Sequence, residues 1–235
     1  MYESSLQPGI IPISGGWWVL IDKPAGLTSF DVVAEVRRIT GQKKVGHAGS
    51  LDPMATGLLV VAVGKATRQL DQNLSGGKVY QAIIRLGAGS STWDRDAKWL
   101  LEIKPPLFGV KRIHEELELI CESDIQMPPM FAALKRFGKP LYRLAHKNKW
   151  IERESRPVKI ESIELNSFDD KSGMVDISIS GGGGVYVRSI ARELGIRLGV
   201  PSLLSELRRT EVGAFKIDDS VSLDRLPEIW SDVKV

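Results

Sequence analysis

An uninterrupted aliphatic run from Leu58 to Val63 constrains the fold of this chain more than any other feature of its sequence. Consecutive apolar residues without polar alternation are typical of a buried strand. The run is much shorter than the roughly 20 apolar residues that a membrane-spanning helix needs. We therefore expect a buried strand here, inside a globular protein.

A capping box predicts the first helix. Thr28 and Asp31 have the spacing at which each side chain can bond the other residue's backbone N–H, and Gly41 is a natural helix stop. We expect the helix to share one apolar face among Phe30, Val33, Ala34 and Val36.

The remaining elements mix strands and helices without a regular alternation. We expect strands at residues 17–21, 79–86 and 175–180, and helices at residues 66–74, 114–121, 141–147 and 187–198. In the strand 79–86, one side would carry Tyr80, Ala82, Ile84 and Leu86. Few strands are joined through compact β-α-β units, so the pattern favours an α+β fold. No repeat or linker divides the chain, and we expect one domain over residues 1–235.

Composition places the chain among ordinary globular proteins. Hydrophobic residues make up 43% and charged residues 26%, which disfavours disorder. The single cysteine, Cys121, cannot form an internal disulfide, and we interpret it as a small core residue. The N-terminal residues show neither the basic start nor the apolar core of a signal peptide. These features favour the cytoplasm.

Positive charge is concentrated in one segment. Residues 135–159 hold nine Lys/Arg and two acidic residues, a net charge of +7, whereas the whole chain carries only +3. A basic tract in a mildly acidic body is typical of a polyanion-binding protein. A solvated, lysine-rich surface helix is the alternative interpretation.

Common cofactor chemistries find no support in the sequence. The glycines at 181–184 lack the lysine of a phosphate-binding loop, and no dinucleotide fingerprint follows an expected strand. The candidate metal ligands are scattered without metal-site spacing: His47, His114, His146 and Cys121. We expect neither a metal nor another cofactor.

The segment from Gly46 to Leu59 stands out instead. Small residues flank Asp52-Pro53, and an acid before proline adopts an extended or turn conformation. At the edge of the buried strand, Asp52 would be presented in a fixed position. Local chemistry alone favours a plainer role, because an Asp before Pro usually caps a turn.

This segment resembles the G-H-x-G-[ST]-L-D-P-x-A-x-G motif of the TruB family of pseudouridine synthases. Further resemblances follow in family order: D-K-P-A-G-L-T-S at 22–29, a tyrosine strand at 78–87, P-P at 128–129 with A-L-K at 133–135, G-V-Y-V-R-S at 184–189 and L-R-R-T at 207–210. The resemblance implies a central mixed, mainly antiparallel sheet flanked by helices, with a catalytic cleft across it. It also implies a cofactor-free isomerisation of uridine 55 in the T-loop of tRNA.

The resemblance assigns roles to individual residues. Asp52 matches the catalytic aspartate, Arg188 the arginine that keeps it ionised, and Tyr80 the tyrosine that stacks on the target base. The positions that contact RNA or line the uridine pocket are matched by His47, Tyr186 and Leu207. The uridine would flip out of its loop at an unstacking cost of about a few kcal/mol. RNA phosphates would be held by Lys135, Arg136, Lys139, Arg143 and Lys147.

Three departures from the family pattern are visible. Phe131-Ala132 replaces Tyr-Ser, Ser202-Leu203-Leu204 replaces A-H-L, and the chain ends where many members continue into a PUA RNA-binding domain. We expect no PUA domain, weaker tRNA binding than in longer members, and a monomer that needs neither a protein partner nor a membrane.

Other hypotheses stay open at this point. The chain could be an RNA-binding or tRNA-folding protein with secondary catalysis, although binding alone does not need Asp52, Tyr80 and Arg188 together. It could modify another RNA site or work under guide-RNA control. A glycoside-cleaving hydrolase would need two carboxylates, of which only Asp52 can be nominated.

Overall fold

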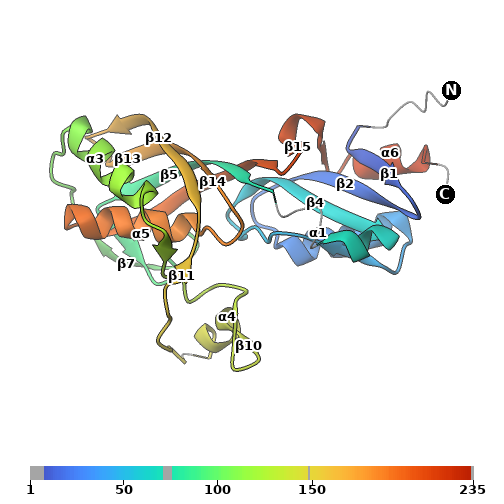
Figure 1. Cartoon of the computed structure of the whole chain (residues 1–235), viewed down its shortest axis with the longest axis horizontal. Coiled ribbons are helices and arrows are strands. Elements are labelled where there is room, and N and C mark those ends of the chain that lie inside the picture. The colour runs from blue at the N-terminus through green and yellow to red at the C-terminus, as the bar shows by residue number, and fades with distance from the viewer. Residues whose placement is uncertain (1–7, 71–75, 148, 234–235) are drawn as a thin grey trace. The chain divides into compact units, whose positions relative to one another are not determined.

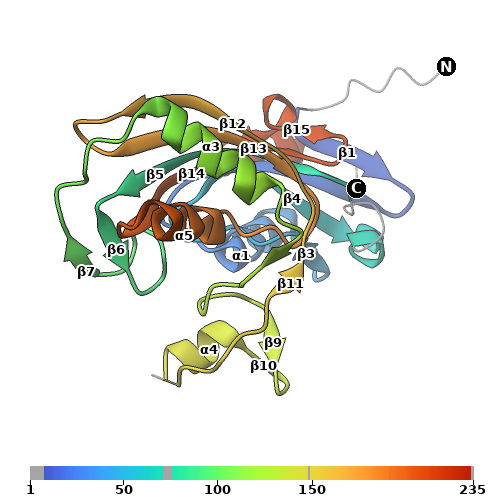
Figure 2. The same cartoon turned by 60° about the vertical axis from the view of Figure 1, so that its left-hand side comes forward.

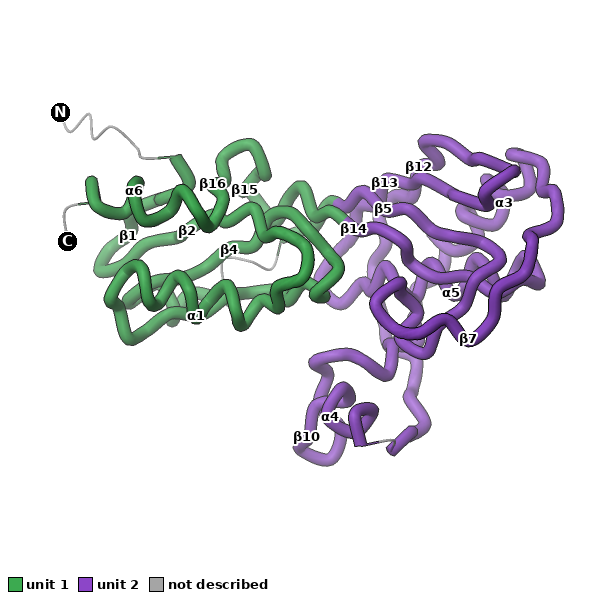
Figure 3. The backbone as a smooth tube through the Cα atoms, turned by 180° about the vertical axis from the view of Figure 1, so that it is seen from behind, with its two compact units in different colours: residues 1–79, 208–235 green, residues 80–207 purple. Residues whose placement is uncertain are grey.

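The structure is a computed structural model that describes residues 8–70, 76–147 and 149–233. The chain forms two compact units, residues 1–79 with 208–235 and residues 80–207 (Figure 3). Figures 1 and 2 show that each unit combines strands with helices, which confirms the expected α+β class. Strands β5 (Lys78–Leu86) and β14 (Ser202–Val212) each continue from one unit into the other. The single domain expected over the whole chain stays a prediction.

The first unit is built on a mixed sheet. Strand β2 (Gly16–Lys23) pairs antiparallel with β1 (Ile10–Ile13) and with β4 (Thr56–Gly64). Strand β4 also pairs antiparallel with β3 (Val45–His47) and parallel with the end of β14. The other elements of this unit are α1 (Ser29–Thr40), the 3-10 helices η1 (Lys65–Gln69) and η2 (Ile217–Asp219), β15 (Phe215–Lys216), β16 (Val221–Ser222) and α6 (Leu226–Ser231).

The aliphatic run forms the centre of β4, as expected. Leu59, Val61 and Val63 pack with apolar residues of β2, α1 and α6. The alternate residues of the run pack in a second cluster with apolar residues of β2 and with Val212 at the end of β14. Both sides of the strand are therefore buried, which explains why the run shows no polar alternation.

Helix α1 confirms its capping signals but not its expected buried face. Thr28 and Asp31 form the reciprocal capping box, and Gly41 ends the helix in the left-handed conformation. The buried face is made of Val32, Val33 and Val36 with Ser29 and Thr40. The expectation was wrong for Phe30 and Ala34, which are exposed. Val32 belongs to the buried cluster with residues of β2 and β4, so the helix buries the side that carries Val32 rather than the side with these two residues.

The second unit contains the rest of β14 and β5, together with the antiparallel pair β12 (Ile160–Asp169) and β13 (Met174–Gly181), in the order β14-β5-β13-β12. Helix α3 (Val110–Cys121) packs against β12 and α5 (Val187–Leu198). Its short strands are β6 (Ala88–Ser90), β7 (Trp99–Glu102), β8 (Ile125–Gln126), β9 (Lys135–Arg136), β10 (Lys139–Pro140) and β11 (Arg156–Pro157), and its short helix is α4 (Leu141–Ala145).

Most expected elements are present with small shifts of their ends. Helix α5 has the predicted bounds, and β5 buries the predicted side. Helix α3 begins at Val110 rather than His114, and α4 ends at Ala145 rather than Lys147. The helix expected at 66–74 is the 3-10 helix η1, and residues 71–75 lie outside the described residues. None of the helices in the described ranges is long and apolar enough to cross a membrane.

Gly57 is a backbone position that a side chain cannot occupy. It lies opposite Arg209 where β4 pairs with β14, has φ 101°, and a Cβ there would lie 2.2 Å from the Arg209 carbonyl oxygen. We predict that Gly57→Ala lowers the free energy of unfolding by about 3 kcal/mol, measured by urea denaturation. Gly26→Ala is the matched control, because Gly26 also has positive φ but open space around it. The control should lose only about 1 kcal/mol, and equal losses would contradict the steric explanation.

Candidate active site

Asp52 lies in the loop between β3 and β4, and a buried lysine fixes this loop. Lys23, the last residue of β2, is fully buried. Its ammonium donates to three carbonyl oxygens, those of Leu27 (2.7 Å), Pro24 (2.9 Å) and Pro53 (3.3 Å). An ammonium has three donors, and a buried charge is tolerated only where such partners exist. Since Pro53 follows Asp52 directly, Lys23 ties the loop to the turn that follows β2.

A serine holds the other side of the same loop. The Ser29 hydroxyl accepts a hydrogen bond from the Leu51 N–H (2.9 Å) and donates to the Leu51 carbonyl (3.2 Å). Within the loop, the Asp52 carbonyl accepts from the Ala55 N–H at 3.0 Å. The expected turn is therefore real, and it is anchored on both sides of a half-buried Asp52.

The two arginines of the L-R-R-T segment support this loop from β14. Arg208 makes a bidentate pair with Asp22 at 3.1 and 2.8 Å, and approaches the Thr56 hydroxyl at 3.4 Å. Arg209 points to the interior, is 1% exposed and donates from Nε to the Leu58 carbonyl at 2.8 Å. Asp22 precedes Lys23 on β2, and Thr56 and Leu58 begin β4, so these contacts fix the β4 end of the Asp52 loop and the strand that carries Lys23.

Positive charge gathers beside Gly49 in the first unit. A Cβ added at Gly49 would lie 3.2 Å from an Arg209 guanidinium nitrogen and 3.4 Å from the Lys78 side chain. Burial, and then the charge of Arg209, lower the pKa of both Lys78 and His47. Cations held together at a partly buried surface make a favourable place for an anion.

His47 contacts the ring of Phe30, which was expected on the buried face of α1. Its imidazole meets the Phe30 ring edge-on at a centroid distance of 5.3 Å. Its Nδ1 is buried and has no hydrogen-bond partner in the part of the chain that the structure describes. Phe30 is 71% exposed, so the pair forms a surface feature of this unit rather than part of its core.

Arg188, in the second unit, is buried rather than a surface residue at the start of α5. It is 4% exposed and lies 3.4 Å from the carboxylate of Asp94, which is equally buried. Its guanidinium also donates to the Phe131 carbonyl at 2.8 Å and to the Thr92 carbonyl at 3.2 Å. The sequence did not predict Asp94 as a partner, because no local pattern joins it to a residue so distant in the chain.

The other expected pocket residues of this unit lie on three different elements. Tyr80 on β5 and Leu207 on β14 are buried, at 8% and 7% exposure. Tyr186, half-buried before α5, donates its backbone N–H to the Gln126 side chain at 3.0 Å. The Gln126 contact thus holds the N-cap residue of the helix that carries Arg188.

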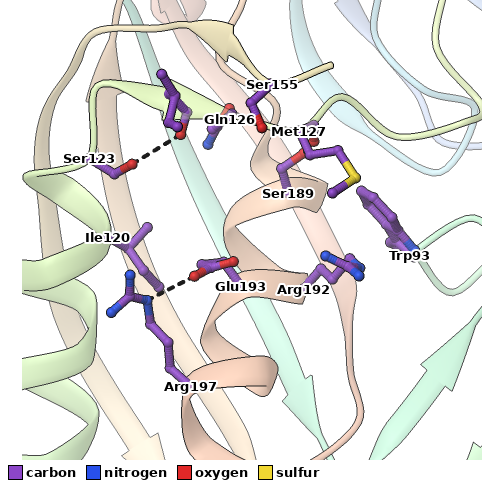
Figure 4. Close-up of a pocket in the computed structure, with 11 residues that line it drawn as sticks. Trp93, Ile120, Ser123, Gln126, Met127, Ser155, Ser189, Arg192, Glu193 and Arg197 are labelled. Carbon is purple, nitrogen blue, oxygen red and sulfur yellow. Dashed lines mark hydrogen bonds and ion pairs between the residues drawn. The ribbon is translucent and has the colours of Figure 1, made fainter. Parts of the chain in front are cut away.

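A pocket of about 230 Å³ lies between α3, β8 and α5, within the second unit (Figure 4). None of the expected site residues lines it. Its polar groups largely bond one another: Ser189 donates to the Met127 carbonyl (2.7 Å), and Arg197 pairs with Glu193 (3.0 Å). We therefore interpret it as packing space behind α5.

The basic tract forms a small lobe of β9, β10 and α4, visible in Figure 2. Its core is made of Met130, Ala132, Leu141 and Ala145. Four of the five expected RNA-contacting side chains are exposed, namely Lys135, Lys139, Arg143 and Lys147. Arg136 is half-buried and pairs with Glu154 at 2.8 Å. The alternative of a single lysine-rich helix is wrong, because among the described residues of this lobe only Leu141–Ala145 is α-helical.

Comparison with known proteins identifies the family. Residues 37–187 match the TruB family pseudouridylate synthase (N terminal domain). The tRNA pseudouridine synthase B of Geobacter sulfurreducens is 41% identical over 212 residues, which cover 90% of this chain and 69% of that protein. That of Thermobifida fusca is 42% identical over 215 residues, which cover 88% of this chain and 73% of that protein.

Solved structures agree with this assignment. The crystal structure of a Cbf5-Nop10-Gar1 complex matches with a TM-score of 0.71 and 30% identity, over 92% of this chain and 56% of that chain. The structure of an H/ACA RNP bound to a substrate RNA containing 2'-deoxyuridine matches with a TM-score of 0.66 and 28% identity, over 91% and 52%. This chain thus spans a little over half the length of both matched chains.

The α+β architecture is therefore a pseudouridine synthase fold, as the motifs predicted. The chain belongs to the TruB family and is an isomerase. In the described part of the chain, no group of three or more His, Cys, Asp or Glu side chains is placed to hold a metal ion.

We predict that Asp94→Ala lowers the free energy of unfolding by about 3–5 kcal/mol, because it removes a buried counter-charge of Arg188. Asp94→Asn keeps the shape and should lose less. Urea denaturation of both variants measures the effect, with the exposed Asp170 changed to Asn as the control. A loss for Asp94→Ala as small as that of the control would contradict the role of this pair.

The lowered pKa of His47 predicts a pH dependence of stability. A histidine whose pKa is lower in the folded state takes up a proton on unfolding, so stability falls as the pH drops below the ordinary value of 6.5. His47→Gln should flatten that part of the curve between about pH 7 and 5. Proton NMR of the His47 ring gives a direct check, and a titration midpoint at or above 6.5 would contradict it.

Proposed function

We propose that this protein converts uridine 55 in the T-loop of tRNA to pseudouridine. Membership of the TruB family supports the reaction, and the names of its relatives support tRNA as the substrate. The observation that carries the proposal is the Asp52 loop, which matches the family motif and is fixed by Lys23 and Ser29. A loop held in this way presents a carboxylate in a defined position before substrate binds.

The reaction exchanges two bonds of the base. The bond from ribose C1′ to N1 of uracil breaks, the base turns, and C1′ joins C5; C5 then loses its proton and N1 takes one up. Asp52 is the catalytic carboxylate of this proposal, and it must be ionised to act. Arg188 keeps Asp52 ionised, and a guanidinium held on carbonyls and on Asp94 is well fixed for that purpose. No atom is gained or lost, so the proposal invokes no cofactor.

Three further residues belong to the uridine pocket of this proposal. Tyr80 stacks on the flipped base, while Tyr186 and Leu207 line its pocket. Their partial or full burial suits contacts with an extruded base better than contacts with a phosphate.

RNA binding uses the charged surfaces of the two units. The cations beside Gly49 and His47 receive the T-loop, and the lobe with Lys135, Lys139 and Arg143 holds phosphates of the T-arm. The protein works in the cytoplasm as a monomer, without a membrane or an obligate protein partner.

A second candidate is isomerisation of a uridine in another RNA. It is favoured by the likeness to a solved RNP that is bound to a substrate RNA. Mapping of the modified position separates the two candidates.

We predict that the purified protein forms pseudouridine at position 55 of an unmodified tRNA transcript, without added metal or nucleotide. Asp52→Asn should lower the single-turnover rate at least about 100-fold, because it removes the reacting carboxylate while keeping the turn. The control, Asp170→Asn, changes an exposed carboxylate and should keep the wild-type rate. Mapping at single-nucleotide resolution reads the product. No product from the wild type, or equal product from Asp52→Asn, would contradict the proposal.

A further inference from the structure

The tip of the basic lobe carries a residue that its turn disfavours. Strands β9 and β10 pair Arg136 with Lys139, so Phe137 and Gly138 alone connect them. Both have positive φ, 51° and 73°. A two-residue hairpin of this kind prefers Asn or Asp followed by Gly, because few other side chains tolerate left-handed backbone. Here a bulky aromatic residue occupies the first position.

The Phe137 ring is not packed in the core, so core packing does not offset the strain of its backbone. It is 83% exposed, the most exposed of the large hydrophobic side chains in the described part of the chain. The guanidinium carbon of its neighbour Arg136 lies over the ring, 5.5 Å from the ring centroid. A strained backbone position that holds an exposed aromatic ring indicates a function outside the fold.

The base of the lobe holds the turn in place. Strand β8 pairs with β11, which joins the two ends of the excursion that contains the lobe. The Leu141 N–H donates to the Leu134 carbonyl at 2.8 Å, and the Tyr142 N–H to the Ala132 carbonyl at 3.1 Å. Leu141 and Ala132 also belong to the buried cluster of the lobe. The ring is thus presented from an ordered hairpin.

Charge around the tip selects its ligand. The stretch from Lys135 to Lys147 contains five Lys/Arg and no Asp or Glu. Lys139 is exposed, as is Lys135 on the facing strand. An aromatic ring among cations on an exposed surface matches a nucleic acid, whose bases stack while its phosphates pair with the cations.

We propose that Phe137 is a base-stacking residue, which takes an unpaired base of the RNA substrate on its ring. The flanking lysines contact the neighbouring phosphates. The proposal rests on the proposed function only in taking RNA as the substrate. It assigns an RNA contact to a residue that the backbone conformation of the turn disfavours.

Phe137→Asn tests this proposal, because it removes the ring and supplies the residue that the turn prefers. We expect the Kd for an unmodified T-arm stem-loop, measured by filter binding, to rise roughly tenfold. The melting temperature should stay equal or rise. Phe137→Trp should keep wild-type affinity, and Leu107→Asn, which removes another exposed apolar side chain of the same unit, should leave the Kd unchanged.

The salt dependence separates stacking from charge. Phe137→Asn should keep the slope of log Kd against log salt, whereas Lys139→Ala should reduce it by about the contribution of one phosphate contact. Stacking can be read directly by 2-aminopurine in the loop of the RNA, whose fluorescence should be quenched by the wild type and Phe137→Trp but not by Phe137→Asn.

Several outcomes would overturn the proposal. These are a Kd for Phe137→Asn within twofold of the wild type, an equal loss in Leu107→Asn, or a change in oligomeric state instead of RNA affinity. Failure of the proposed function would give a different experimental result from failure of the stacking proposal. A wild type that binds the stem-loop but forms no pseudouridine contradicts the activity, while the ratio of the two Kd values still tests Phe137.

Discussion

The buried ammonium of Lys23 is the interaction on which the Asp52 loop depends. It joins the carbonyls of Pro24, Leu27 and Pro53, which come from two separate motifs of the sequence. Removing it would take one donor from each of these carbonyls, of which that of Pro53 would keep the Gly26 N–H at 2.8 Å. The pair of Arg208 with Asp22 adds a second link between β14 and the same region. Motifs that lie far apart in the chain are thus parts of one support for a single carboxylate.

The sequence predicted the elements whose ends or buried faces are defined by residues close together in the chain. The capping box of α1, the aliphatic run of β4 and the glycine after α5 each predict an element from a few neighbouring residues. Strands β12 and β14 were missed because their sequences carry many polar residues. In β14 the charged residues find partners in Asp22 and the Leu58 carbonyl, on other strands. No local pattern contains that information.

The candidate site likewise has a part that the sequence predicted and a part that it did not. The motif predicted Asp52 and its turn, because the residues that define a tight turn are adjacent in sequence. The partners that fix the site are not adjacent, and the sequence did not predict Lys23 as an anchor of the loop or Asp94 as a partner of Arg188. Phe30 was placed in the core because it is apolar, yet it is exposed beside His47. Hydrophobicity alone cannot separate a core residue from an exposed aromatic residue.

The buried cations of the first unit bear on function as well as on the fold. Lys23 and Arg209 donate to backbone carbonyls, which satisfies donors that would otherwise be costly to bury. The charge of Arg209 also adds to burial in lowering the pKa of His47 and Lys78. Cations that lie close together in this way attract a polyanion. Arg209, which supports the Asp52 loop through the Leu58 carbonyl, thus also contributes to the charge that would bind RNA under the proposed function.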